Sequence, residues 1–195
     1  SAVNSFLLYY NQLTNEEKLD LCNELVRIIP TAKVIQTMGR STISKNSLGC
    51  PQRDIIKTAL TLLTFWQRIL ESNIQIDNKF NFQGVYAKFY NLHLLNCSSR
   101  LKTAVVRLFP LLAINYTTTN GNGDKGFVNN IIRRLWKLAN SPTSKKEFTQ
   151  LHRTSLEGLV QVFLEFRQEQ KVALLRERSL NEDTLKTVKE MDLLI

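Results

Sequence analysis

The feature that most constrains this chain is an apolar stripe at helical spacing directly after Pro51. Its members follow one another three or four positions apart: Ile55, Ala59, Leu62, Trp66 and Ile69. That spacing puts them on one face of a helix, while charged and polar residues take the other faces. Proline is tolerated at the first helical position, where its missing N–H has no partner to lose. We therefore predict a helix that lies against a core.

Further helix boundaries are marked by capping boxes and by helix-breaking residues. A Ser or Thr with Glu three positions later can satisfy the free amides of a first turn, and this pattern starts at Thr14, Ser144 and Ser179. Pro30 should end the helix that begins at Thr14. Gly39 should end the short helix that follows it.

The middle of the chain predicts three more helices and a connector. One runs from Gly84 to about Asn96, and a second from Ser98 or Ser99 to a kink at Pro110 in VVRLFPLLAI, which we expect to be the most buried helix. The third helix presents Phe127, Ile131, Leu135 and Leu138 on an apolar face that Val128, Ile132 and Trp136 widen. Residues 73–82 alternate apolar and polar residues, but no second strand is available to pair with them, so an extended connector is expected.

These patterns predict an all-α fold, an irregular multi-helix bundle of about seven or eight helices. The penultimate helix would span residues 144–178, a length of about 50 Å at about 1.5 Å per residue. Residues 1–178 would form a single helical domain, since a chain of 195 residues is long enough for one core. Residues 179–195 would form a short amphipathic terminal helix that serves as a docking element. The abrupt apolar end, MDLLI, is compatible with an excised piece of a longer protein.

Composition excludes several classes of protein. The longest apolar stretches are interrupted or fall well short of the roughly 20 residues that cross a bilayer, so no membrane partner is expected. Three scattered cysteines do not make a disulfide framework, which favours an intracellular protein, nuclear or cytoplasmic.

No recognisable catalytic set is present, so we do not expect an enzyme, a cofactor, a metal site or a small-molecule substrate. The P-loop, HExxH, CxxC and GxSxG motifs are all missing. His93 and Cys97 stand at i and i+4 and could face one another as base and nucleophile, but no third orienting group is in sight. His93 fits better as a core residue bonded to backbone.

A glycine motif precedes the third of these middle helices. Gly121, Gly123 and Gly126 are spaced as in a dinucleotide-binding turn. No alternation of strands and helices surrounds them, which argues against that fold. The remaining possibilities are a surface loop or a simple anion site, in which Gly123, Lys125 and Gly126 hold a phosphate at the helix N-terminus.

The net charge of +9 is concentrated in the middle of the chain. Residues 1–30 carry −2, residues 31–140 carry +11, and residues 141–195 are neutral. Such a concentration favours an anionic partner. The candidate contacts are Arg133, Arg134, Lys137, Lys145 and Lys146, with Arg100, Lys102, Arg107, Arg40 and Lys45 in support. The alternative is that these residues are ordinary solvated faces that point in several directions.

The preferred functional interpretation is a non-enzymatic helical adaptor or assembly subunit of a nucleic-acid-associated complex, whose basic surface contacts RNA or DNA phosphates. A protein partner is expected in either case. The alternative is a pure protein–protein scaffold that binds a partner helix or an acidic segment. In it, the long helix from Ser144 and the terminal helix from Leu180 present apolar edges to the partner. The partner-binding positions of the terminal helix would be Leu185, Val188, Met191 and Leu194.

Overall fold

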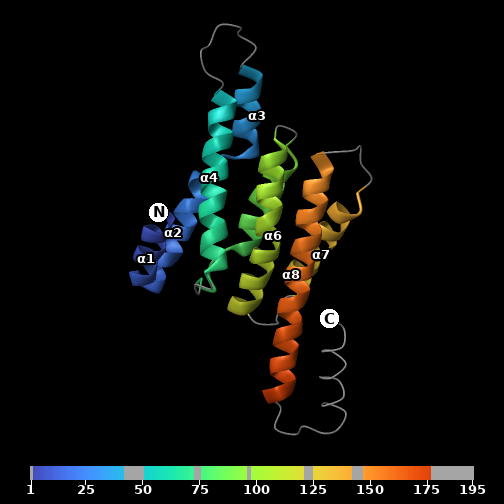
Figure 1. Ribbon diagram of the computed structural model, residues 1–195. Coiled ribbons are helices and arrows are strands. Elements are labelled where there is room, and N and C mark those ends of the chain that lie inside the picture. Colours follow the sequence, from blue (N-terminus) through green and yellow to red (C-terminus); the bar gives the residue numbers. More distant parts are fainter. Residues whose placement is uncertain are drawn as a thin grey trace.

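The computed structural model describes residues 2–41, 51–72, 76–95, 98–120, 125–141 and 147–176 (Figure 1). Within these ranges the chain forms eight α-helices and no strand. The predicted all-α bundle of seven or eight helices is therefore confirmed. The predicted terminal helix over 179–195 lies outside the described residues.

The eight described helices are joined by links of different lengths, from two residues between α1 and α2 to ten between α4 and α5. Their bounds are α1 Ala2–Gln12, α2 Asn15–Ile28, α3 Ala32–Ser41, α4 Pro51–Glu71, α5 Phe82–His93, α6 Ser99–Asn120, α7 Lys125–Ala139 and α8 Glu147–Arg176. With 30 residues, α8 is the long helix that the sequence predicted. At about 1.5 Å per residue it is about 45 Å long.

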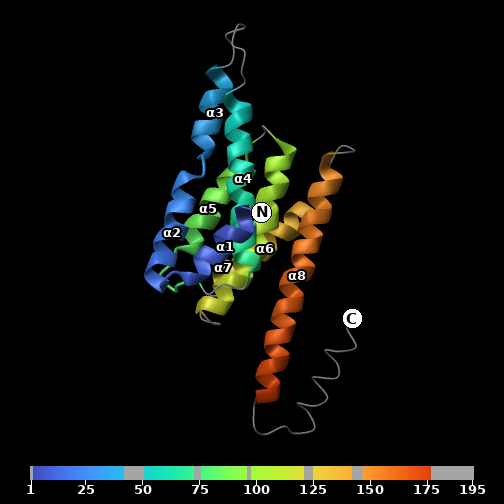
Figure 2. The same cartoon turned by 60° about the vertical axis from the view of Figure 1, so that its left-hand side comes forward.

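Helix α6 is the centre of the bundle and packs against α4, α5, α7 and α8 (Figures 1 and 2). It has buried side chains all round its circumference, among them Val105, Val106, Phe109 and Leu112. The prediction that this region is the most buried helix agrees with that burial. Helix α6 continues past Pro110 to Asn120, farther than the short continuation over residues 111–114 that the sequence predicts after a kink. A mid-helix proline costs about 3 kcal/mol, and burial on all sides offsets that cost.

Aromatic rings connect the helices through the core. Trp66 of α4 is fully buried and stacks on Phe80 of the connector, with ring centroids 5.6 Å apart. Tyr86 of α5 meets Phe109 of α6 edge to face at 5.0 Å. It also meets Phe127 of α7 at 5.7 Å. Stacked and edge-to-face ring pairs of this kind stabilise the fold beyond the area that they bury, so one network holds α4 to α7 together.

The N-terminal helices are fixed by specific polar contacts. The predicted capping box is present: Thr14 Oγ1 accepts from the Glu17 amide at 3.3 Å, and the Glu17 carboxylate accepts from the Thr14 amide at 2.8 Å. Tyr10 and Cys22 are buried and hydrogen-bonded at 3.2 Å, which joins α1 to α2. Lys88 of α5 donates to the backbone carbonyl of Val26, at the C-terminal end of α2 where a positive charge is favourable.

Several predicted boundaries need correction. Helix α3 continues through Gly39 to Ser41, because a glycine ends a helix only where the chain needs a left-handed residue. Helix α5 begins at Phe82 rather than Gly84, since the Asn81 side chain accepts from the Gly84 amide at 2.8 Å and caps it. The connector shows no strand over residues 76–81, as expected.

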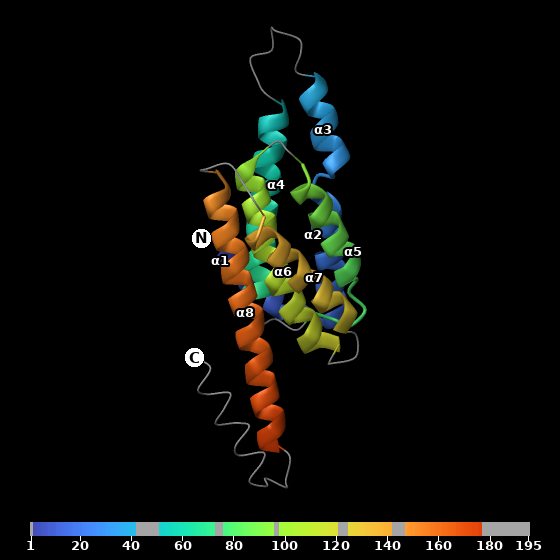
Figure 3. The same cartoon turned by 90° about the vertical axis from the view of Figure 1, so that its right-hand side faces the viewer.

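The described part of the molecule is elongated, with α3 at one end and the C-terminal half of α8 at the other. Figure 3 shows α8 along one edge, with its C-terminal half extending past the ends of α6 and α7. A helix that projects in this way leaves side chains without neighbours from its own bundle. The described helices thus form a packed body past which one end of α8 extends.

Candidate functional site

A groove of about 810 Å³ lies between α5 and α7 and contains three of the predicted cationic residues. Arg133, Arg134 and Lys137 come from α7, on the side that faces α5. Aromatic and small side chains from both helices form the rest of the lining, together with two amides: Tyr86, Tyr90, Ala87, Phe127, Gly126, Gln83 and Asn130. No carboxylate is among these described lining residues.

Arg134 is held in place by an aromatic ring. Its guanidinium lies over the ring of Tyr90, 4.5 Å from the centroid, in a cation–π contact. Its Nε is buried and has no hydrogen-bond partner among the described residues. Burial raises the pKa of the nearby Tyr86 hydroxyl to about 12, although the positive charge of Arg134 works against that rise. Tyr86 is therefore neutral at physiological pH.

His93 lies at the end of α5 and is buried, with 5% of its surface exposed. Burial, together with the positive charges of Arg134 and Lys102, lowers the pKa of its imidazole to about 4, although a hydrogen bond with the Lys102 backbone works against that fall. Its Nδ1 has no hydrogen-bond partner in the described structure. The expectation of a core histidine is confirmed. Its proposed partner Cys97 lies outside the described residues, so the base-and-nucleophile interpretation is not tested.

The remaining predicted cations do not gather at the groove. Lys102 is close enough to lower the pKa of His93, but Arg100 and Arg107 lie about 140–160° away from Lys102 around α6 at about 100° per residue. Arg40 belongs to α3, at the far end of the molecule (Figure 1). Lys45, Lys145 and Lys146 lie outside the described residues.

The predicted anion site is only partly described. Helix α7 begins at Lys125, as an anion site at a helix N-terminus would need, and Gly126 lines the groove. Gly123 and the side chain of Lys125 lie outside what the structure describes. The dinucleotide-binding interpretation finds no support, because the described residues contain no strand.

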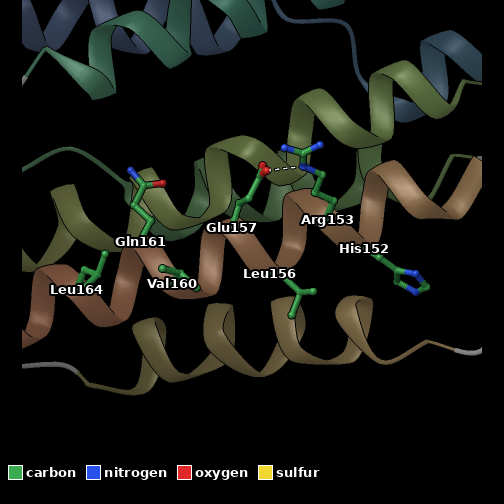
Figure 4. Close-up of a pocket in the computed structure, with 7 residues that line it drawn as sticks. All are labelled: His152, Arg153, Leu156, Glu157, Val160, Gln161 and Leu164. Atoms are coloured by element: carbon green, nitrogen blue, oxygen red, sulfur yellow. Dashed lines mark hydrogen bonds and ion pairs between the residues drawn. The ribbon is translucent and has the colours of Figure 1, made fainter. Parts of the chain in front are cut away.

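A second surface runs along α8, the long helix whose apolar edge the alternative interpretation offers to a partner, although the sequence did not identify its residues. Four large apolar side chains are about half exposed there: Leu156 (51%), Val160 (55%), Phe163 (56%) and Leu164 (48%). We call these four residues the α8 stripe. Figure 4 shows three of them beside the ion pair in which Arg153 Nε donates to Glu157 at 2.8 Å. The opposite face of α8 is in the core, through Leu151, Leu159 and Val162.

Sequence reasoning missed parts of both surfaces. It placed Trp136 on the buried face of α7, but this side chain is 61% exposed. The packed face of α7 includes Phe127, Ile131 and Leu135 and does not extend round the helix as far as Trp136. It did not predict that Tyr86 and Tyr90 of α5 line the same groove as the arginines of α7, or that Arg134 lies over the Tyr90 ring. The α8 stripe could have been found from the sequence, because apolar residues recur on two faces of this helix. A surface helix needs only one apolar face for packing, so the second face was available to a partner.

Two searches of the described residues bear on other classes of function. No three His, Cys, Asp or Glu side chains in the described part come together as metal ligands. None of the described helices has both the length and the hydropathy that a bilayer span requires.

Comparison with known proteins gives one match. Neither the curated proteins nor the solved structures yielded a match to the chain. The family model for the TBCD C-terminal domain matches residues 1–195, the whole of the sequence. The chain therefore belongs to the family of TBCD C-terminal domains.

Proposed function

We propose that this chain is a non-catalytic helical scaffold that binds protein partners of the tubulin-folding machinery. The family supports this, because TBCD denotes tubulin cofactor D. The same family membership supports a cytoplasmic rather than a nuclear location. The nucleic-acid interpretation has no support from the family, and its cations do not all share a face.

The α8 stripe is the observation that carries this proposal. Scattered apolar residues are normal on a surface, but four large ones in contiguous turns of one helix favour an interaction site. The spacing from Leu156 to Val160 to Phe163 is four and then three residues, which suits a partner helix laid along α8.

The expected energy is compatible with a specific contact. Burying a Leu, Val or Phe side chain fully contributes about 1.5–3 kcal/mol. Since the four side chains are already about half covered, each would contribute about 1 kcal/mol more on binding, a gross gain of about 4 kcal/mol. Association costs consume part of any such gain, so the partner must make further contacts elsewhere.

A binding assay with purified tubulin and purified tubulin cofactors tests the proposal. We expect the double variant Leu156→Glu/Val160→Glu to lose affinity for its partner by about tenfold or more, since two charges would be desolvated at the contact. Leu8→Glu is the matched control, because Leu8 is 68% exposed on α1. If the double variant binds as well as the control, α8 is not the docking surface. If none of these proteins binds the parent chain, the family-based partner is wrong.

The terminal segment is a second proposed element of the scaffold. Leu185, Val188, Met191 and Leu194 repeat at helical spacing and lie outside the described residues. Deleting residues 179–195 should weaken the same binding while the helical circular dichroism of the remaining chain melts at an unchanged temperature. Undiminished affinity would remove this segment from the proposal.

A further inference from the structure

We propose that the groove between α5 and α7 binds an acidic segment of a partner protein, whose carboxylates are held by Arg133, Arg134 and Lys137. This groove shares no lining residue with the α8 stripe. The two proposals therefore stand or fall separately.

The charge of the groove is uncompensated in the described structure. The four ion pairs found among the described residues are all within single helices, and none involves Arg133, Arg134 or Lys137. The described lining contains no Asp or Glu. Three positive charges in a recess with apolar walls concentrate the potential and attract an anion.

Arg134 is arranged for a carboxylate. The contact with Tyr90 fixes the plane of its guanidinium, which leaves the edge of the group to donate two parallel hydrogen bonds. Its buried Nε lacks a partner within the described chain, and an unsatisfied buried donor is costly. That donor is closed to solvent, so a carboxylate would meet the outer nitrogens of the guanidinium.

The walls of the groove favour a peptide. Tyr86 and Phe127 line the groove with only small parts of their surfaces exposed, 8% and 6%, which gives its base an apolar character. Asn130 adds an amide that can bond to a peptide backbone. The volume of about 810 Å³ falls within the roughly 300–1,000 Å³ typical of ligand sites.

The dimensions also argue against a nucleic acid. Backbone tracking needs cations in a row along the strand, with affinity growing with each neutralised phosphate. The described cations at this groove form a short cluster, and Arg100 and Arg107 lie on another side of α6. A short acidic segment is the occupant that the cluster fits.

Fluorescence polarisation with three labelled probes tests the proposal on the full chain. The probes are a short peptide of alternating Glu and Phe, the same peptide with Gln in place of Glu, and a single-stranded RNA of equal net charge. We expect only the Glu peptide to bind, with affinity that falls as salt is raised. Arg133→Ala/Lys137→Ala should weaken it by about tenfold or more.

Two further variants sharpen the test. Arg53→Ala/Lys57→Ala is the matched control, since it removes the same pair of residue types at the same spacing from an exposed face of α4, and it should change binding by less than about twofold. Arg134→Lys keeps the charge but loses the two-pronged donor, and it should weaken binding by about tenfold. The proposal is overturned if the control pair weakens binding equally, if the Gln peptide binds as tightly, or if the RNA binds more tightly and displaces the Glu peptide.

Discussion

The contact between Pro110 of α6 and Gly158 of α8 predicts a measurable coupling. A Cβ added at Gly158 would lie 3.2 Å from Cγ of Pro110 and 3.5 Å from Cδ1 of Leu135. The first distance is shorter than ordinary contact, and a pyrrolidine ring can move its Cγ only by a change of pucker, a much smaller displacement than a rotamer change of a flexible side chain. We therefore expect Gly158→Ala to destabilise the fold, although alanine is the better helix former.

The magnitude follows from two opposing effects. Replacing Gly by Ala within a helix stabilises by about 1 kcal/mol, while overpacking a filled contact costs about 1–3 kcal/mol. The net change should be a loss of about 1 kcal/mol. In a Pro110→Ala background the ring carbons are gone, so Gly158→Ala should then gain about 1 kcal/mol. The coupling energy of the double-mutant cycle is thus about 2 kcal/mol.

Urea unfolding followed by circular dichroism measures all four corners of this cycle, provided that the slopes agree. Pro110→Ala itself should fold, because it restores a backbone hydrogen bond and the higher helix propensity of alanine while losing ring packing. Gln161→Ala, at an exposed position on α8, should have the same effect in both backgrounds. The reasoning is refuted if Gly158→Ala changes the free energy of unfolding equally, within about 0.5 kcal/mol, with and without Pro110.

Three other properties can be checked in the same way. Thr14→Ala removes the cap of α2 and should lower the free energy of unfolding by about 1 kcal/mol in urea, whereas Thr58→Ala, an exposed position within α4, should cost less. His93 has a folded-state pKa of about 4 against an ordinary value of 6.5, so its stabilising contribution is complete above pH 6.5 and is lost as the pH falls toward 4. The urea midpoint of the parent chain should therefore drop as the pH is lowered over this window. The control variant His152→Gln should show the same drop, and His93→Phe a smaller one. Burial raises the pKa of the Cys22 thiol, so in a Cys50→Ser/Cys97→Ser background this thiol should react with Ellman's reagent only after unfolding, and rapid reaction of the native protein would contradict its burial.

The helices could be predicted because their signals are local. The capping box at Thr14 and the stripe that includes Ala59 and Trp66 depend on residues within a few turns, and the structure confirms both. The length of helix after Pro110 was underestimated because the cost of a proline is local, while the burial that offsets it comes from four neighbouring helices. Tertiary packing outweighed the local rule in that case.

The candidate surfaces could be predicted only in part. The cations of α7 follow from sequence, since Arg133, Arg134 and Lys137 are close in the chain. Their pairing with Tyr86 and Tyr90 joins residues some 45 positions apart and depends on how α5 lies against α7. The α8 stripe depends equally on which of two apolar faces the bundle leaves uncovered, and helical periodicity alone does not decide that.

The central position of α6 has a consequence for how the domain can be divided. It contacts α4 and α5 from the N-terminal part of the chain and α7 and α8 from the C-terminal part. Cleavage of the chain on either side of α6 would expose a broad apolar surface of this helix to water, so neither fragment should fold alone as a monomer. In the intact domain the two parts should unfold in a single cooperative transition. Complementary fragments that are produced separately should associate and refold when mixed.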